Sequence, residues 1–139
     1  IEGRLAAALT CSVRSSAESR YSSVGLEVGL IHNHALQSGR PGGNRSGWQA
    51  TAQWQSQAFS VQISHTNLDD SRSYSPILSG GAERRVRRNQ ILLQYRRPIQ
   101  LGKVSATLLF NFFNQSQTSN IGLFTTDDMS AEMGLRFVF

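Results

Sequence analysis

The side chains with the clearest potential for chemistry lie near the middle of the chain, where Ser64 and His65 are followed by Asp69 and Asp70. Serine, histidine and aspartate are the residue types of a hydrolytic triad, in which the histidine takes a proton from the serine and the acid orients the histidine. The residues around Ser64 alternate between polar and apolar types, however, as in a β-strand, and adjacent strand residues point to opposite faces. We therefore expect Ser64 and His65 to point apart, and we predict that the chain is not an enzyme.

Other candidates for a metal or cofactor site are isolated. Cys11 is the single cysteine, so it forms no internal disulfide and belongs to no cluster of thiolate ligands. His32, His34 and His65 share the parity of apolar residues near segment ends, which is typical of side chains at a membrane interface. The glycine-rich stretch 39–47 lacks the strand and helix that flank a phosphate-binding loop. The sequence thus predicts no metal and no cofactor.

The run Glu83–Arg88 holds four arginines and would suit a nucleic-acid-binding surface. The formal net charge is only +5, and no helix-turn-helix or RNA-binding motif accompanies the run. We predict no nucleic-acid partner.

The elements that must position these side chains are indicated by hydrophobic periodicity. Apolar residues recur at every second position over most of the chain, which is typical of β-strands with one apolar face, and no helical stripe of comparable length is present. Leu92, Leu109 and Phe113 break the alternation. The seven predicted strands are 5–14, 23–30, 48–55, 59–64, 90–96, 105–113 and 132–139.

The composition fits a membrane protein that crosses with strands. Only 39% of the 139 residues are hydrophobic, and no run reaches the roughly 18 apolar residues of a membrane helix. A transmembrane strand needs only about 9–11 residues, of which alternate ones are apolar.

The connections between the predicted strands alternate in length. Outer-membrane barrels have short periplasmic turns and longer extracellular loops, and a soluble β-sandwich has no reason to separate its loops in this way. The short connections are 15–20, 56–58 and 97–103, and the long ones are 35–47, 68–87 and 115–129.

The end of the chain, 132–139, runs polar-x-Gly-apolar-x-aromatic-x-aromatic and stops at Phe139. It resembles the C-terminal insertion signal of bacterial outer-membrane β-barrel proteins, which the barrel-assembly machinery reads. The resemblance implies that Gly134, Leu135, Phe137 and Phe139 form this assembly signal. With Phe139 in the periplasm, every long connection falls on the extracellular side, where the arginine run would meet lipopolysaccharide phosphates.

We therefore predict an all-β fold, an antiparallel up-and-down transmembrane β-barrel in the bacterial outer membrane, with residues 1–139 as its C-terminal segment. Bacterial barrels have even strand numbers, so seven strands imply at least one more upstream, in a larger barrel. An eighth strand hidden within 68–87 is the competing count. Aromatic side chains on the apolar face form the predicted membrane girdle: Trp48, Trp54, Phe59 and Tyr95.

The opposite face of the predicted strands would line the lumen. It is rich in glutamine and mildly basic, so it would offer hydrogen bonds to sugars or a preference for anions; alternatively, its charges only pair across strands. The predicted pore-lining residues are Arg14, Glu27, Gln49, Gln53, Gln62, Gln90, Gln94, Arg96, Glu132 and Arg136.

A second resemblance concerns Ser119–Phe124, which looks like the segment before the final strand of tetratricopeptide-barrel exporters, and Ser73–Pro76 with the arginines after it is similar to that group too. The resemblance implies export of an exopolysaccharide or a polypeptide through the barrel. The predicted partners are outer-membrane lipid and lipopolysaccharide, the barrel-assembly machinery and a hydrophilic cargo. A small non-transport barrel (adhesin, anchor or lipid-facing enzyme) and a soluble basic β-domain are the alternatives.

Overall fold

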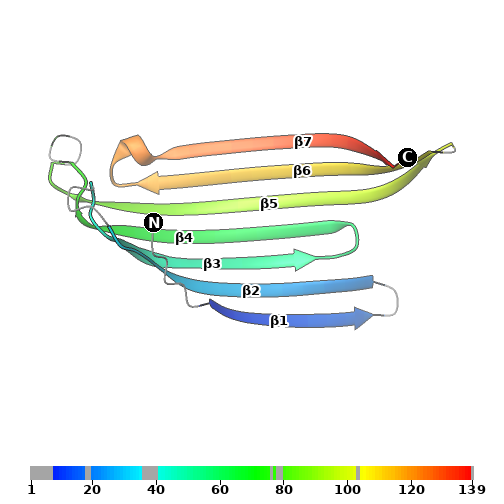
Figure 1. Ribbon diagram of the computed structural model, residues 1–139, viewed down its shortest axis with the longest axis horizontal. Helices are drawn as coiled ribbons and strands as arrows, with labels where there is room; N and C mark the ends of the chain where they lie inside the picture. Colours follow the sequence, from blue (N-terminus) through cyan, green and yellow to red (C-terminus); the bar gives the residue numbers. More distant parts are fainter. Residues whose placement is uncertain are drawn as a thin grey trace.

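Seven antiparallel strands form one sheet in the computed structural model, which describes residues 8–17, 20–35, 41–75, 77, 80–102 and 104–138. Each strand pairs with the next in the sequence, in the order β1-β2-β3-β4-β5-β6-β7 (Figure 1). The strands are β1 (Ala8–Ala17), β2 (Arg20–Asn33), β3 (Arg45–Gln55), β4 (Phe59–Ser73), β5 (Glu83–Leu101), β6 (Val104–Ser119) and β7 (Thr126–Val138), with a short 3-10 helix, η1 (Gly122–Phe124), before β7. The predicted all-β antiparallel architecture is confirmed. The sheet is open, because β1 and β7 do not pair with each other.

The strands extend well beyond their apolar stretches. The predicted long loop 68–87 is largely wrong, because β4 and β5 pair as far as Ser73 and Glu83. Among the described residues between these two strands there is no additional strand, so the alternative of a hidden eighth strand there fails. Backbone pairing continues through these polar residues because a ladder of hydrogen bonds does not require an apolar face.

The turn predicted at 97–103 is shorter in the structure, because β5 continues through Pro98 to Leu101. Pro98 is tolerated at this place because it lies beyond Tyr95, the partner of the first β4 residue, Phe59. The N–H of Arg96 points toward the β4 side, where it donates to the Ala58 carbonyl at 2.8 Å, and the nitrogen of Pro98, two residues on, faces the same side. No ladder partner is lost there.

The alternation of connection lengths is retained. The connections after Gln55 and Leu101 are short and lie at what we call the turn end of the sheet; those at 34–44, 74–82 and 120–125 lie at the opposite, loop end (Figure 1).

One face of the sheet collects the apolar residues of every strand. The register carries Val13 of β1 to Val24, then to Trp54, Val61 and finally Leu93 of β5. Cross-strand partners lie on the same face, so the apolar sets of all seven predicted strands meet on one surface. A shift of one residue in any pairing would have moved a whole set to the other face.

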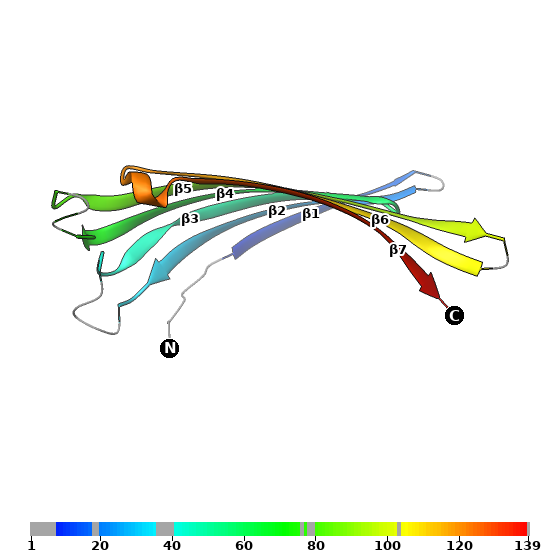
Figure 2. The ribbon, with the colours of Figure 1, turned by 90° about the horizontal axis from the view of Figure 1, so that it is seen from above.

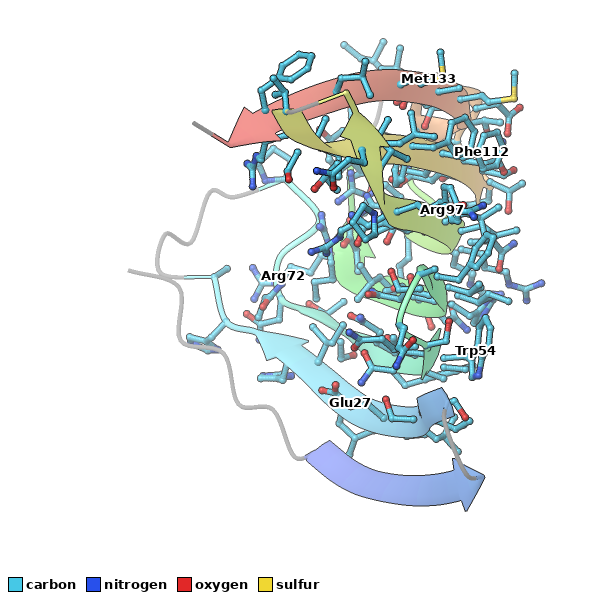
Figure 3. All side chains as sticks on the ribbon, turned by 90° about the vertical axis from the view of Figure 1, so that its right-hand side faces the viewer. Glu27, Trp54, Arg72, Arg97, Phe112 and Met133 are labelled. Atoms are coloured by element: carbon cyan, nitrogen blue, oxygen red, sulfur yellow. The ribbon has the colours of Figure 1, made fainter. Side chains whose placement is uncertain are left out.

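The sheet is twisted and bowed: β1 and β2 at the loop end and β6 and β7 at the turn end bend toward the same side (Figure 2). Trp54, Phe112 and Met133 lie on the convex side of this bow, whereas Glu27 and Arg72 lie on the concave side (Figure 3). The apolar face is therefore convex. Its residues are open to solvent in the isolated chain: Val24 is 50% exposed and Ile63 51%.

The apolar band on the convex face slopes across the strands. On β2 it covers Val24–Leu30, whose middle is in register with Gln90 of β5. On β6 it covers Ala106–Phe112, whose middle is in register with Arg96. The middle of the band is level with Gln90 on both β2 and β3, and it lies nearer the turn end on β6. On β7 the middle of Met129–Phe137 is level with Tyr95, so the shift does not continue there.

Candidate functional site on the concave face

The residues predicted to line a lumen all occupy concave-face positions. The register joins Glu27 through Thr51 and Ser64 to Gln90, and it joins Glu132 to Asn111 and Gln94. The other members of the set fall on the same face by the alternation of their strands: Arg14, Gln49, Gln53, Gln62, Arg96 and Arg136. The side chain of Arg14 lies outside the described residues.

Amide side chains form hydrogen-bonded rows across this face. The Ser64 hydroxyl donates to Gln90 Oε1 at 3.2 Å, and Gln90 Nε2 donates to Gln115 Oε1 at 2.7 Å. A parallel row runs from Ser60 to Gln94 at 3.2 Å and on to Asn111 at 3.4 Å. Because an amide carries both donors and acceptors, each row presents hydrogen-bonding groups across β4, β5 and β6.

A hollow of about 370 Å³ opens on the same face toward the loop end. Its polar lining comes from β2, β3, β4 and β5 and includes Glu27, Gln49, Thr66 and Arg88. Asn33 also lines it, and its Oδ1 is buried with no hydrogen-bond partner among the described residues. A buried acceptor without a donor is costly, so a hydroxyl or a water donating to Asn33 would stabilise this hollow.

The concave face is not uniformly polar. Leu92 and Phe113 face each other across β5 and β6, and Leu109 faces Arg96. These are the residues that break the alternation of the sequence. Leu92 and Phe113 form an apolar patch between the two amide rows, and Leu109 lies on the other side of the row of Gln94 and Asn111.

A buried ionic cluster closes the loop end of the concave face. Asp70 Oδ1 accepts a hydrogen bond from Arg45 Nε, and Asp70 Oδ2 accepts one from Arg84 Nε, both at 2.9 Å. The side chains of Asp70 and Arg84 are only 3% and 8% exposed. Two cations share one carboxylate, so the cluster keeps a net positive charge.

Arg84 also packs against two aromatic rings. Its guanidinium carbon lies 4.5 Å from the centre of the Tyr74 ring and 4.4 Å from that of Phe124. Tyr74 and Phe124 contact each other edge to face at 4.8 Å. Cation–π contacts of this kind are strongest when the cation is desolvated. The two segments that carry the exporter resemblance, 73–76 and 119–124, thus meet at Arg84.

Gly42 allows the 34–44 connection to reach this cluster. Its φ of +79° is in the left-handed region that favours glycine, and a side chain there would collide with the Asp70 carboxylate. Gly42 N–H donates to the Ser73 carbonyl at 3.3 Å, and the Gly42 carbonyl accepts from Arg72 N–H at 3.1 Å. Three connections are thus fastened to one cluster.

The predicted girdle residues lie on the convex face. Phe59 and Tyr95 contact each other near the turn end, with tilted rings whose centres are 4.6 Å apart, and Trp54 lies one register step from them, 41% exposed. Trp48 lies at the opposite end of the band, 5.0 Å from the ring of His65.

The predicted assembly signal lies on β7, at an edge of the sheet. Leu135 and Phe137 are on its convex side, paired with Leu108 and Ala106, while Gly134 is on the concave side. Phe139 lies outside the described residues.

The catalytic reading of Ser64 and His65 receives no geometric support. Ser64 is buried on the concave face beside Gln90. His65 lies on the convex face, with its Nδ1 2.6 Å from Asn89 Oδ1. Within the described part of the chain there is no group of His, Cys, Asp and Glu that could hold a metal ion. No helix of that part is long and apolar enough to cross a membrane.

The Asp70 cluster was not predicted as a site from the sequence. Nothing in the spacing of Arg84 and the 119–124 motif indicates that they meet. Polar residues at both parities, as at 69–73, are typical of a loop and are the only local signal of this segment.

Comparison with protein-family models, with curated proteins and with solved structures finds no match to this chain.

Proposed function

We propose that this sheet is part of the wall of an outer-membrane β-barrel, and that its concave face lines a pore for a hydrophilic polymer or polypeptide. The observation that carries the proposal is the slope of the apolar band on the convex face. A soluble sheet needs an apolar face, but it does not need one with a particular slope.

The slope can be converted into a strand tilt. Between β2 and β6 the centre of the band moves from the level of Gln90 to that of Arg96, roughly 20 Å at about 3.3 Å per residue. Four strand spacings of about 4.8 Å span roughly 19 Å sideways. A band perpendicular to the barrel axis would therefore require a tilt of about 45°, at the upper end of the roughly 35–45° found in such barrels.

The convex face has the remaining features of a lipid-facing wall. Its band is flanked by Trp48 at one end and by Trp54, Phe59 and Tyr95 at the other. On β7 the band runs from Met129 to Phe137, about 26 Å along the strand at about 3.3 Å per residue. A tilt of about 40° reduces this to roughly 20 Å, close to the roughly 25 Å apolar band of such barrels.

The concave face would serve a hydrophilic cargo by exchange of hydrogen bonds. The amide rows from Ser60 and Ser64 to Asn111 and Gln115 offer donors and acceptors at two levels of the wall, about 13 Å apart at about 3.3 Å per residue. A polymer passing along them replaces water at each step without meeting one deep binding site. No covalent chemistry is involved in this mechanism.

The Asp70 cluster would stand at the external mouth. It fastens the 34–44, 74–82 and 120–125 connections to the inner side of the wall. Rigid loops at the mouth would define the width of the opening. Its net positive charge would favour anionic segments of a cargo.

An open sheet leaves two edges that lipid does not tolerate. Further strands must therefore pair with β1 and β7 in the membrane, and the total decides between a filled barrel of about eight strands and a channel of about sixteen. A filled barrel would be a non-transport protein.

The first test is to extract the protein from the outer membrane and compare its mobility with and without boiling. A heat-modifiable species much larger than 15.4 kDa, with ion conductance in planar bilayers, would support the pore. A heat-modifiable species of 15.4 kDa without conductance would replace it with the non-transport barrel. Absence from the membrane fraction would refute both.

A further inference from the structure

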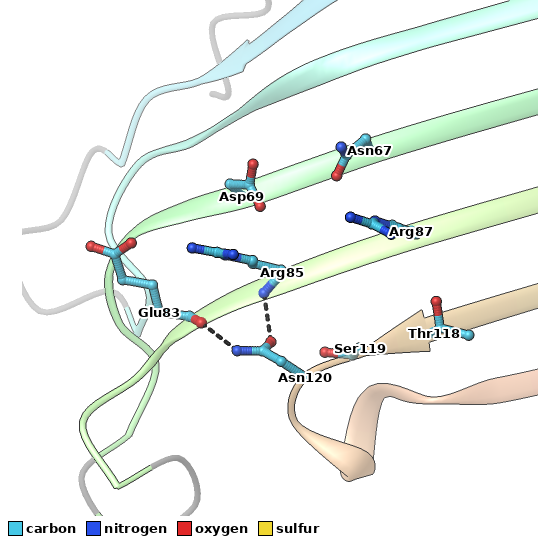
Figure 4. Close-up of a pocket in the computed structure, with 8 residues that line it drawn as sticks. All are labelled: Asn67, Asp69, Glu83, Arg85, Arg87, Thr118, Ser119 and Asn120. Atoms are coloured by element: carbon cyan, nitrogen blue, oxygen red, sulfur yellow. Dashed lines mark hydrogen bonds between the residues drawn. The ribbon is translucent and has the colours of Figure 1, made fainter.

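The convex face carries a second polar site, beyond the apolar band at the loop end of β4, β5 and β6. It is a hollow of about 480 Å³ whose charged lining consists of Asp69, Glu83, Arg85 and Arg87, with Asn67, Thr118, Ser119 and Asn120 as neutral polar residues (Figure 4). The alternation of β5 divides the arginine run between the two faces: Arg84 and Arg88 are concave, whereas Arg85 and Arg87 are convex. The concave pair is bonded to Asp70 and Gln117, so the two pairs have different roles.

Of the two arginines in this hollow, Arg87 is the one whose cross-strand neighbours carry no charge. Its cross-strand neighbours are Asn67 on β4 and Thr118 on β6, both neutral. Arg85 lies level with Asp69, which partly offsets its charge. Within the described residues, neither arginine side chain forms an ion pair or hydrogen bond.

The hollow has a fixed shape because Asn120 holds its rim. Asn120 Oδ1 accepts from the N–H of Arg85, and its Nδ2 donates to the carbonyl of Glu83, both at 2.7 Å (Figure 4). The side-chain amide thus continues the β5–β6 ladder one step past Ser119, where the backbone pairing ends. Arg85 and Arg87 are thereby carried on rigid backbone.

The position of Arg87 relative to the apolar band indicates which part of a bilayer this hollow would meet. On β5 the band begins at Ile91, so Arg87 lies about 13 Å farther along the strand at about 3.3 Å per residue. At a tilt of about 40° this is roughly 10 Å along the membrane normal. The polar layer of a bilayer is about 5–8 Å deep on each side, and an arginine side chain reaches toward it from just outside.

We propose that this hollow binds a phosphate group of lipopolysaccharide in the outer leaflet, with Arg87 as the principal ligand, Arg85 as the second, and Asn67 and Thr118 as neutral hydrogen-bonding partners. The inference rests on the proposed function, because it requires the convex face to meet lipid. Guanidinium groups match the geometry of phosphate oxygens. The carboxylates of Asp69 and Glu83, which also line the hollow, oppose the anion and weaken its binding.

The test compares single variants of the protein extracted from its membrane in mild detergent. Lipid A with two phosphates is titrated against the wild type, Arg87→Gln and a matched control, Arg97→Gln, which removes the same charge from the same face of β5 at the turn end. We expect Arg87→Gln to weaken binding at least about tenfold, as expected for the loss of a charge-assisted hydrogen bond. Arg97→Gln should leave the affinity within about twofold.

Three further measurements sharpen the assignment. Asp69→Asn should tighten binding, because it removes a like charge. Arg87→Lys should retain part of the affinity, because it keeps the charge but loses the two-pronged contact. Lipid A without phosphates should bind the wild type no better than phosphorylated lipid A binds Arg87→Gln.

Equal losses in Arg87→Gln and Arg97→Gln would overturn the proposal, and so would competition by inorganic phosphate at concentrations similar to those of lipid A, which would indicate a site for a free anion. Each variant is first checked for heat-modifiable mobility. A membrane-embedded, heat-modifiable protein whose lipid A affinity does not depend on Arg87 would lose only this inference, whereas a protein absent from the membrane would lose the proposed function itself.

Discussion

Asp70 and Arg84 form an ion pair at 2.9 Å, and their side chains are 3% and 8% exposed. Both residues lie on strands that the sequence pattern assigns to a loop. Their contact holds the ends of β4 and β5 together where the register shifts, between Asp69 and Ser73. This pair contributes to fixing the loop end of the sheet, where the apolar side chains of Val86 and Ile121 are also buried.

Removing the charge of Asp70 should therefore destabilise the protein. Asp70→Asn leaves Arg84 buried without its anion, and breaking such a pair costs about 3–5 kcal/mol. Asp69→Asn is the matched control, since Asp69 is exposed on the other face. The readout is the temperature at which the heat-modifiable mobility is lost. If both variants lose it at the same temperature, the cluster does not stabilise the loop end.

Two substitutions of Asn120 separate the role of its side-chain oxygen from that of its side-chain nitrogen. Asn120→Asp keeps the acceptor for the Arg85 N–H but loses the donor to the Glu83 carbonyl, whereas Asn120→Ala loses both. Hydrogen exchange of the Arg85 amide, followed by mass spectrometry of the 83–88 peptide, should accelerate in Asn120→Ala and stay slow in Asn120→Asp. Equal acceleration in the two variants would show that the side chain acts only by filling space.

Neighbouring residues on opposite faces of β4 provide a test of the lipid-facing surface. Val61 lies at the centre of the apolar band and Gln62 on the concave face. A lysine at the mid-plane of a lipid-facing surface costs about 2–4 kcal/mol, so Val61→Lys should lower resistance to urea unfolding in detergent or vesicles, while Gln62→Lys should change it little. A soluble domain would tolerate both substitutions, and its solubility would rise with Val61→Lys.

The sidedness of the two sheet ends can be measured by cysteine labelling. In a Cys11→Ser background, Ala82→Cys places a thiol in the 74–82 connection at the loop end, and Gln57→Cys places one at the turn end. A membrane-impermeant maleimide added to intact cells should label only Ala82→Cys, and Gln57→Cys should react after the outer membrane is permeabilised. The reverse pattern would invert the topology and place the arginine-lined hollow on the inner leaflet.

The sequence alone determined the strands and their two faces. A period of two residues is a local property, because it follows from the alternation of side chains along a single extended chain. For this reason the positions of Leu26, Trp54, Ile91 and Phe110 were assigned to one face before any pairing was known. The short and long connections followed from the spacing of the same pattern.

Only the tertiary structure decided how the strands are placed against one another. The slope of the apolar band, the apolar patch of Leu92 and Phe113, and the meeting of Asp70, Arg84 and Phe124 all depend on register. Register is set by contacts between residues far apart in the chain, and the alternation within one strand is the same for every even shift of its neighbour. Polar segments such as 69–73 and 83–88 carry no apolar period at all, so their pairing became visible only when the partner strand lay beside them.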